Sequence, residues 1–293
     1  MTPSVDSAVA DVDAPAPSTA GDPAEDGAFT VATTTASLPG SAAGRTLPST
    51  VFTPTGAPSP RPLVVVSPGF QMERTQYTSY ARHLATWGFV VVLSDYADRG
   101  FFADHQLLAN DVSDVLDWAL AQTTLAVDAQ RIAVAGHSLG GKISVFAATQ
   151  DTRIKAVVAW DPVDSTSPSV VPQKMTTLAA AVAVVGETTN ASGGGMPCAP
   201  AAENFAQFYA ASPSPALSVT VSGADHMDWV DDPSCGFCGF CAAGTAMPEV
   251  ARKVSRRVNV AWLRRQLLAD VAMDAWLDAP PELAGGQVTI ARR

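Results

Sequence analysis

One serine of this chain stands in a sequence context that could make it a nucleophile. Residues 136–140 read GHSLG, with an apolar run of strand character before them and a helical pattern after them. At such a sharp strand-to-helix turn, Gly136 and Gly140 leave room where a larger side chain would collide with the neighbouring strand or helix. The turn raises the Ser138 hydroxyl at a helix N-terminus, where free N–H groups favour a developing negative charge. We therefore expect Ser138 to attack a carbonyl carbon. A phosphate-binding glycine turn is the alternative, although only Lys142 is a basic residue nearby.

A serine nucleophile needs a general base, and the chain contains four histidines. His226, in the segment SGADHMDW, directly follows the last predicted sheet strand. This position gives the chain order serine, acid, histidine that is typical of α/β-hydrolases. A loop histidine that merely pairs with Asp225 or Asp228 is the alternative. We expect packing or solvated roles for His83 and His105, and we expect His137 to point away from the nucleophile.

Two acidic residues at strand ends could orient the histidine. Asp161 ends the strand that follows the nucleophile helix, and Glu187 ends the next strand. Asp161 is favoured because Pro162 stops its strand in a fixed turn and Asp164 could brace the loop. Glu187 precedes a Gly/Ser/Asn-rich stretch, which we expect to fix nothing.

The remaining parts of the predicted site are amide groups and apolar side chains. The backbone N–H groups of Phe70, after the first parallel strand, and of Leu139, after the serine, would bind an oxyanion. Trp160, Met227 and Trp229 lie near these loops in sequence and, with Phe70, would favour a hydrophobic acyl or alcohol group. Each of them alone is more often a core residue.

The elements that must position these residues alternate along the chain. Residues 29–38 and 45–54 read as two antiparallel edge strands. Apolar strands are then predicted at 61–70, 89–95, 131–136, 154–161, 179–187 and 216–225, and helices at 75–88, 107–122, from 140, at 202–212 and at about 249–268. Strands that are apolar along their whole length and alternate with helices indicate a parallel sheet covered on both faces. Ligands bind outside the carboxyl ends of such strands.

Composition limits the classes of partner and the number of domains. The chain has 293 residues, 47% of them hydrophobic, which is enough for one large core in residues 29–293. A formal net charge of −10 disfavours nucleic acid as a partner. No apolar stretch reaches the roughly 18 to 20 residues that a membrane span needs. We expect a monomer.

The first 28 residues are rich in Ala, Pro and Asp and carry almost no large apolar side chains. We expect residues 1–28 to be a disordered lead-in. They lack the basic and apolar regions of a signal peptide. The protein would then be cytoplasmic, or secreted or periplasmic with its export signal removed and replaced by Met1.

The four cysteines favour export. Cys198 sits in one irregular stretch, and Cys235, Cys238 and Cys241 crowd another, as loop-stapling disulfides do. Every complete pairing of the four joins Cys198 to a member of that cluster. Zinc is the rival because C-x2-C-x2-C resembles ligand spacing, but no His-x3–5-His follows, and we predict no metal site. Free thiols remain a third possibility.

Several motifs together resemble the chlorophyllase family. They are GHSLGGK, AWDPVD, MPCAPAAENFAQFY and GADHMDWVDD, and the segment from VVVSPGF to VVVLSD is similar to the wider group that also contains bacterial polyester hydrolases. The chain departs from the family at Leu139, where chlorophyllases typically carry Arg. The resemblance implies an α/β-hydrolase fold, with a mostly parallel central sheet and helices on both faces.

The resemblance also implies an activity. It implies a cofactor-free serine hydrolase that cleaves small-molecule or polymeric carboxylic esters through Ser138, Asp161 and His226. A hydrophobic or aromatic ester, a porphyrin ester and a polyester are the substrate classes to separate. A catalytically silent binding protein is the rival from another class, and the same triad would also support acyl transfer or amide cleavage.

Overall fold

Nine strands form one sheet. The computed structural model describes residues 21–40, 44–165, 168–192, 197–233 and 238–293. The strands are β1 (Thr30–Pro39), β2 (Thr46–Thr55), β3 (Arg61–Ser67), β4 (Val90–Ser94), β5 (Val127–His137), β6 (Ile154–Trp160), β7 (Ala181–Glu187), β8 (Ala216–Val221) and β9 (Val288–Arg292). Their order is β1-β2-β4-β3-β5-β6-β7-β8-β9. The six inner strands from β3 to β8 run parallel, whereas β1, β2 and β9 pair antiparallel at the two edges.

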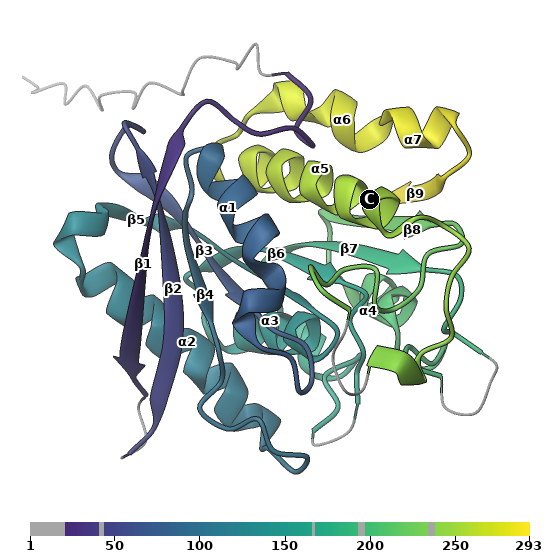
Figure 1. Cartoon of the computed structure of the whole chain (residues 1–293), viewed down its shortest axis with the longest axis horizontal. Coiled ribbons are helices and arrows are strands. Elements are labelled where there is room, and N and C mark those ends of the chain that lie inside the picture. Colours follow the sequence, from purple (N-terminus) through teal and green to yellow (C-terminus); the bar gives the residue numbers. More distant parts are fainter. Residues whose placement is uncertain (1–20, 41–43, 166–167, 193–196, 234–237) are drawn as a thin grey trace, which may run out of the picture.

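Helices cover both faces of this sheet (Figure 1). They are α1 (Thr78–Thr86), α2 (His105–Ala121), α3 (Leu139–Gln150), α4 (Phe205–Ala211), α5 (Pro248–Leu267), α6 (Asp274–Asp278) and α7 (Pro281–Ala284). On β3, Val64 and Val66 face a core shared with α1 and α5, whereas Leu63 and Val65 face the core shared with α2, α3 and α4. Side chains alternate across a strand, so two buried faces need strands that are apolar throughout. The predicted fold class is confirmed.

The sequence pattern missed elements at the far edge. The helix expected at about 249–268 is α5, and the two antiparallel strands near the N-terminus are β1 and β2. Of these two strands, β1 lies at the edge and β2 does not, because β2 also pairs with β4. The strand β9 and the short helices α6 and α7 were not predicted. They carry few apolar residues in a regular pattern, so periodicity gives little signal there.

Part of the expected disordered lead-in is packed against the fold. Residues 1–20 lie outside the described residues, but residues 21–28 are described. The Asp22 carboxylate accepts hydrogen bonds from the buried Arg257 guanidinium at 2.9 and 2.7 Å. The Gly27 N–H donates to the Thr86 hydroxyl at 2.8 Å, and a Cβ at Gly27 would overlap the backbone there. The expectation of disorder is therefore wrong for residues 21–28, where a few polar contacts replace the missing apolar anchors.

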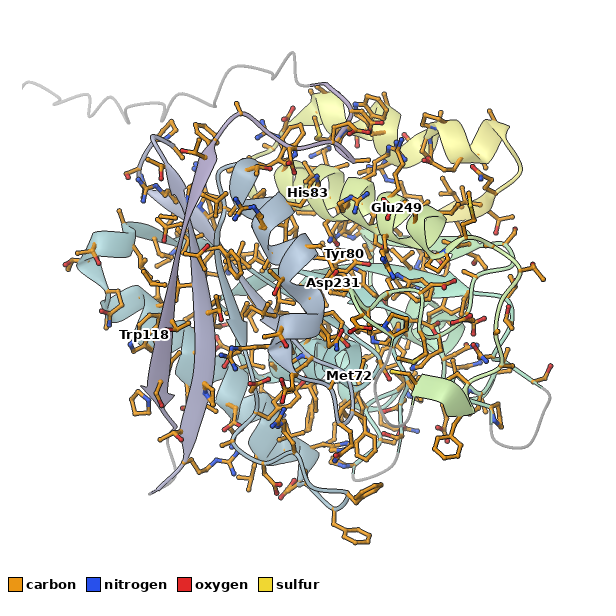
Figure 2. The ribbon with its side chains drawn as sticks, in the orientation of Figure 1. Met72, Tyr80, His83, Trp118, Asp231 and Glu249 are labelled. Atoms are coloured by element: carbon orange, nitrogen blue, oxygen red, sulfur yellow. A yellow bond between two sulfur atoms is a disulfide. The ribbon has the colours of Figure 1, made fainter. Side chains whose placement is uncertain are left out.

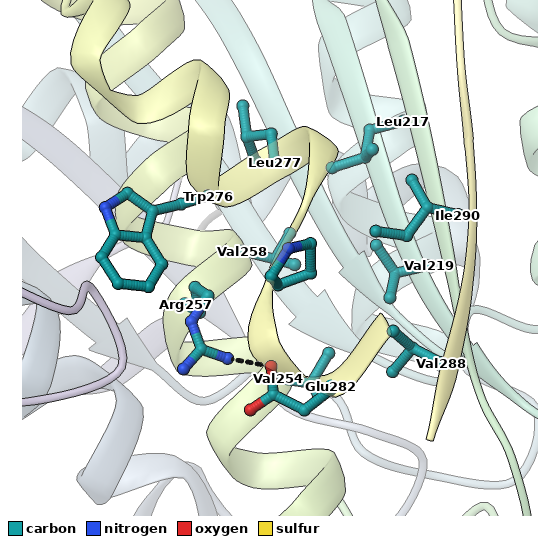
Figure 3. Close-up of a pocket in the computed structure, with 11 residues that line it drawn as sticks. Leu217, Val219, Val254, Arg257, Val258, Trp276, Leu277, Glu282, Val288 and Ile290 are labelled. Carbon is teal, nitrogen blue, oxygen red and sulfur yellow. Dashed lines mark hydrogen bonds and ion pairs between the residues drawn. The ribbon is translucent and has the colours of Figure 1, made fainter. Parts of the chain in front are cut away.

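A small pocket between α5, the C-terminal helices and the edge of the sheet is part of the core (Figure 3). Its walls are mainly apolar, and its charged groups, Arg257 and Glu282, are paired with each other. It contains no nucleophile beside a base. Within the described ranges, no helix is long and apolar enough to cross a membrane.

Candidate active site

The turn between β5 and α3 has a strained geometry that presents Ser138. This residue has φ 54° and ψ −120°, a conformation that side-chain-bearing residues rarely adopt. A Cβ at Gly136 would lie 2.5 Å from the backbone of Gly140, and one at Gly140 would lie 2.6 Å from the carbonyl oxygen of Pro68. Both glycines are thus required by close backbone packing, as the motif predicted.

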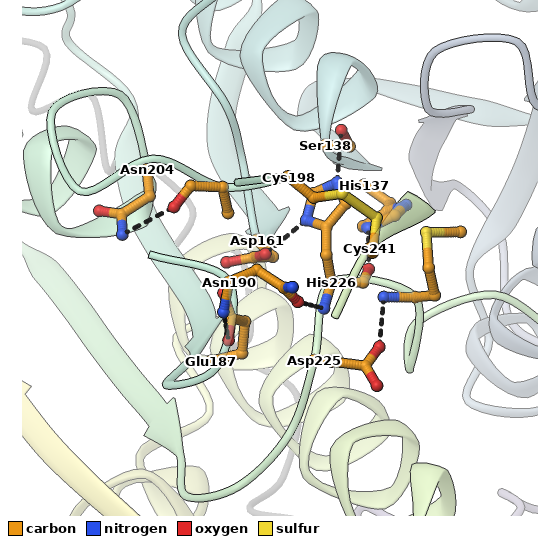
Figure 4. A network of polar contacts seen from close by, with 12 residues as sticks. His137, Ser138, Asp161, Glu187, Asn190, Cys198, Asn204, Asp225, His226 and Cys241 are labelled. Atoms are coloured by element: carbon orange, nitrogen blue, oxygen red, sulfur yellow. Dashed lines mark hydrogen bonds and ion pairs between the residues drawn. A yellow bond between two sulfur atoms is a disulfide. The ribbon is translucent and has the colours of Figure 1, made fainter. Parts of the chain in front are cut away.

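Three residues from three different loops form one hydrogen-bonded chain (Figure 4). His226 Nε2 lies 2.9 Å from the Ser138 hydroxyl oxygen, and His226 Nδ1 lies 2.6 Å from Asp161 Oδ2. A carboxylate only accepts, so Nδ1 carries the proton and Nε2 is free to accept one from the serine. This arrangement can activate a hydroxyl as a nucleophile.

Asp161 is held rigidly under the histidine. It follows β6, is fully buried, and has a positive φ of 39°. Its N–H donates to the carbonyl of Val185 at 2.6 Å, which ties it to the neighbouring strand β7. Burial raises the pKa of Asp161, and the hydrogen bond from His226 opposes that rise. A buried carboxylate facing a histidine stabilises the imidazolium that forms when the base takes a proton.

Glu187, the alternative acid, supports the histidine loop through its backbone. Its buried carboxylate accepts the N–H groups of Thr189 and Asn190. Asn190 Oδ1 in turn accepts the N–H of His226 at 2.7 Å, and Asn190 Nδ2 donates to the carbonyl of Ala242 at 3.0 Å. Burial, reinforced by the charge of Asp161, raises the pKa of Glu187 to about 7. The expectation that the stretch after Glu187 fixes nothing is therefore wrong, because Asn190 bridges two loops.

A second chain of hydrogen bonds joins the loop after β3 to the histidine loop. The N–H of Gly69 donates to the Tyr77 hydroxyl at 3.1 Å, and that hydroxyl lies 2.9 Å from His137 Nδ1. His137 Nε2 lies 2.8 Å from the carbonyl oxygen of His226. A carbonyl only accepts, so His137 donates from Nε2 and accepts the Tyr77 proton at Nδ1. Burial lowers the pKa of His137, which keeps it neutral. No local sequence pattern indicates this role of His137.

The cysteines lie where a bridge can hold the histidine loop. Cys198 and Cys241 form a disulfide across a sequence separation of 43 residues. Cys238 is also disulfide-bonded, and Cys235 lies outside the described residues. The predicted bridge from Cys198 to the cluster is confirmed, with Cys241 as its partner. Among the residues that the structure describes, no group of His, Cys, Asp and Glu could hold a metal ion.

The residues predicted to supply the oxyanion hole come from two different loops and share one pocket. Phe70 and Leu139 line one common pocket. Leu139 is the first residue of α3, where N–H groups have no partner within the helix. Within the described part of the chain, the Phe70 N–H donates no hydrogen bond. Both amides are therefore available to a ligand.

The aromatic residues expected to contact substrate divide into two kinds. Trp160 and Trp229 are fully buried, and their indole N–H groups donate to Asn259 and Ser255. The expectation that these two tryptophans contact substrate is corrected, because each is a core residue with a satisfied polar group. Met227 is partly buried against the same core, and its contact with substrate stays a prediction.

The other histidines are buried rather than solvated. His83 is 3% exposed and its Nε2 lies 2.9 Å from the carbonyl of Glu25. His105 is 8% exposed and contacts Lys142. Neither lies in the hydrogen-bonded chain of Ser138 and His226.

The fold and the nucleophile turn define an α/β-hydrolase. The chlorophyllase family model matches residues 19–285, so the chain belongs to the chlorophyllase family. Chlorophyllase-1 of Arabidopsis thaliana is 26% identical over 261 residues, which is 76% of this chain and 80% of the relative. Chlorophyllase-2 of the same plant is 23% identical over 239 residues, or 71% of this chain and 74% of the relative.

A shorter match comes from a cutinase. Cutinase est2 of Thermobifida alba is 30% identical over 103 residues, and this match covers 34% of each chain. The similarity therefore extends along most of the chain for the two chlorophyllases and along about a third of it for the cutinase.

Proposed function

We propose that the protein hydrolyses carboxylic esters through a serine triad and an acyl-enzyme. Ser138 attacks the ester carbonyl, His226 takes the hydroxyl proton and returns it to the leaving alcohol, and Asp161 holds the imidazole in the required tautomer. Water activated by His226 then releases the acid. The observation that carries this proposal is the position of His226 within 2.9 Å of the serine oxygen and 2.6 Å of the Asp161 carboxylate.

The amides of Phe70 and Leu139 supply the oxyanion hole in this proposal. Both line the pocket beside the serine, and neither has a competing acceptor in the described residues. Preorganised N–H groups that face the developing oxyanion need no rearrangement during the reaction, which makes them effective in catalysis.

The substrate we propose is an ester with a large apolar group. Phe101 and Phe102, on the loop before α2, are 63% and 101% exposed, and the Phe101 ring lies 5.3 Å from that of Phe70. Exposed aromatic rings beside a reaction site favour apolar ligands. Membership of the chlorophyllase family supports a porphyrin ester as the first candidate, and the partial likeness to a cutinase supports a polyester as the second.

A series of p-nitrophenyl esters of increasing acyl length tests this proposal, followed by chlorophyll and polyester film. We expect activity that rises with acyl length and disappears in Ser138→Ala. Absence of ester cleavage would favour a catalytically silent binding protein. Faster cleavage of matched amides would favour amide hydrolysis, and product formation only with an added acyl acceptor would favour acyl transfer.

We further propose that the protein acts in an oxidising compartment, as a secreted or periplasmic protein, and as a monomer. The disulfide between Cys198 and Cys241 supports the first part, since such bonds persist outside the reducing cytoplasm. Thiol titration of protein from its native source and size-exclusion chromatography with light scattering test the two parts.

A further inference from the structure

A pocket beside the proposed oxyanion hole includes a buried imidazole that the ester chemistry does not use. Its lining combines apolar side chains, Phe70, Ala103, Leu108 and Leu139, with the polar or charged groups of Gln71, Tyr96, Asp98, Arg99 and His105. His105 is the first residue of α2 and is 8% exposed. A buried imidazole is costly unless its nitrogens are paired, so the partners of both nitrogens matter.

Lys142 pairs with one of these nitrogens. This lysine lies on α3, its side chain is fully buried, and its Nζ is 3.1 Å from His105 Nδ1. The same ammonium donates to the carbonyl of Ser165 and lies 3.4 Å from Asp164 Oδ1. Asp164 in turn accepts the N–H of Val170 at 2.8 Å, so the carboxylate is itself held in place.

These contacts determine the tautomer of His105. The carbonyl and the carboxylate only accept, so Lys142 is the donor to both, and its charged ammonium has no acceptor to offer the imidazole. Nδ1 of His105 must therefore accept, which leaves the proton on Nε2. Burial and the charge of Lys142 lower the pKa of His105 to about 4, so the ring stays neutral at ordinary pH.

The Nε2–H group is the one that remains unused. It makes no hydrogen bond with any residue that the structure describes. Nε2 is also absent from the described buried polar atoms that lack a partner, so it retains contact with solvent. A neutral N–H donor of fixed orientation suits a neutral acceptor such as a carbonyl oxygen, because the nearby Lys142 charge is already paired with Asp164 and the Asp98 carboxylate also lines the pocket.

We propose that His105 Nε2–H binds a second carbonyl oxygen of the substrate, and that the enzyme therefore prefers esters which carry another carbonyl group at a fixed distance from the scissile one. This inference rests on the proposed ester hydrolysis and specifies its substrate class. His105 acts here as a substrate-binding residue, and Lys142 is the positioning residue that sets its tautomer.

The test compares two series of activated esters. One series is methyl p-nitrophenyl diesters of linear dicarboxylic acids with about four to eight carbons, and the other is p-nitrophenyl alkanoates of matched length. The readout is the ratio of kcat/KM between diester and alkanoate at each length. We expect one length at which the wild-type ratio is highest. His105→Leu should lower that ratio by about 3- to 10-fold, the range of one neutral hydrogen bond. His105→Gln, which keeps an acceptor for Lys142 and a donor for the pocket, should retain most of it.

Controls separate this inference from the proposed function. Gln106→Leu, on the neighbouring residue outside the pocket, should leave the ratio unchanged. A flat wild-type ratio at all lengths, or a ratio that His105→Leu does not change, would overturn the inference while leaving ester hydrolysis intact. Failure of the wild-type protein to cleave either series would instead contradict the proposed function.

A measurement on the wild-type protein covers the case in which His105→Leu does not fold. Nitrogen-15 NMR of labelled histidine reports which ring nitrogen is protonated. We expect His105 to be neutral with its proton on Nε2 at pH 7. A proton on Nδ1 would overturn the inference, because Nε2 would then have no hydrogen to donate.

Discussion

The loop that carries His226 and the tip of the loop between β4 and α2 differ in how firmly hydrogen bonds hold them. The His226 N–H is held by Asn190, its carbonyl by His137, and the residues after it by α1, where Asp231 accepts the N–H of Ser79 at 2.9 Å. Figure 2 shows Asp231 beside α1.

The loop between β4 and α2 is held at its base, where Arg74 donates to Asp95 and the Ala97 N–H donates to Asp111, but its tip is exposed. Phe102 is fully exposed at its tip, and Phe101 meets Phe70 edge to face. Proton transfer needs atoms fixed within fractions of an ångström, whereas apolar substrate contacts need surface that is open to the ligand. Changes to the loop that carries His226 should therefore lower kcat and stability, whereas changes at the exposed tip of the loop between β4 and α2 should alter KM and substrate choice.

The largest effect should come from the acid. Asp161→Asn presents an amide to His226 and favours the wrong tautomer, so turnover should fall on the order of 10⁴-fold. Glu187→Gln keeps an acceptor for the backbone of Asn190 and should cost less than about tenfold. Steady-state kinetics on one p-nitrophenyl ester measure both variants. The reverse ranking would make Glu187 the catalytic acid.

Removal of the Tyr77 hydroxyl should break the second hydrogen-bonded chain. Tyr77→Phe leaves the Gly69 N–H and His137 Nδ1 without a partner, which costs roughly 1 to 3 kcal/mol of unfolding free energy. We also expect kcat to fall about tenfold because the histidine loop loses a constraint. Tyr80→Phe is the matched control, since the Tyr80 hydroxyl is buried with no partner in the described residues. If the two substitutions had equal effects on urea unfolding and kcat, the hydrogen bonds of Tyr77 would not be what holds the histidine loop.

Reduction of the disulfides should destabilise the loop that carries His226. The bridge between Cys198 and Cys241 closes a loop of 43 residues, which corresponds to about 4 kcal/mol in the chain-entropy description. Reductant, or the double variant Cys198→Ser with Cys241→Ser, should lower the melting temperature and reduce activity several-fold. Calorimetry and ester assays with and without reductant measure this. Unchanged activity after complete reduction would show that the hydrogen bonds of His226 hold its loop in place without the disulfide.

The raised pKa of Glu187 predicts how the stability of the protein depends on pH. Its pKa of about 7 in the folded protein lies above the ordinary value of 4.5, so the folded state binds more protons between these values. Stability should therefore be greater below about pH 4.5 and should fall as pH rises toward 7. Asp228, with a pKa raised by burial to about 6, acts in the same direction. Urea unfolding at pH 5 and pH 8 should show a smaller difference in Glu187→Gln than in the wild type, and an equal difference would contradict this account.

The smallest effect should be found on the exposed loop. Phe102→Ser removes apolar surface that no core residue covers, so stability should change by less than about 0.5 kcal/mol. KM for long-chain esters should rise a few-fold, with kcat and the rate on acetate esters unchanged. Kinetics across the acyl series check this. A loss in kcat would show that this loop also positions the catalytic groups.

The parts of the site that sequence could predict are those whose chemistry is local. The glycines around Ser138 follow from one sharp turn, and strand ends locate His226 and favour Asp161 over Glu187. The roles of His137 and Asn190 depend on contacts with residues 60 and 36 positions away in the chain. No periodicity reports such contacts. The same limit explains Trp160 and Trp229, because a loop-side aromatic and a core aromatic have the same local sequence.

The sequence predicted the central strands of the fold but not all of its edge elements. Runs such as residues 61–67 and 90–94 are apolar throughout, which only a sheet covered on both faces allows. Residues 21–28 and β9 were missed because they are held by side-chain hydrogen bonds and edge pairing. Neither of these leaves a hydrophobic pattern.

Covalent labelling of Ser138 tests most directly whether this residue is the nucleophile. A p-nitrophenyl phosphonate mimics the tetrahedral intermediate and should give one adduct, which peptide mapping by mass spectrometry places on Ser138, with loss of all esterase activity. Ser138→Ala should neither react nor retain more than about 10⁻⁴ of the wild-type rate. An adduct on another residue, or a Ser138→Ala variant that keeps a tenth of the activity, would contradict the account.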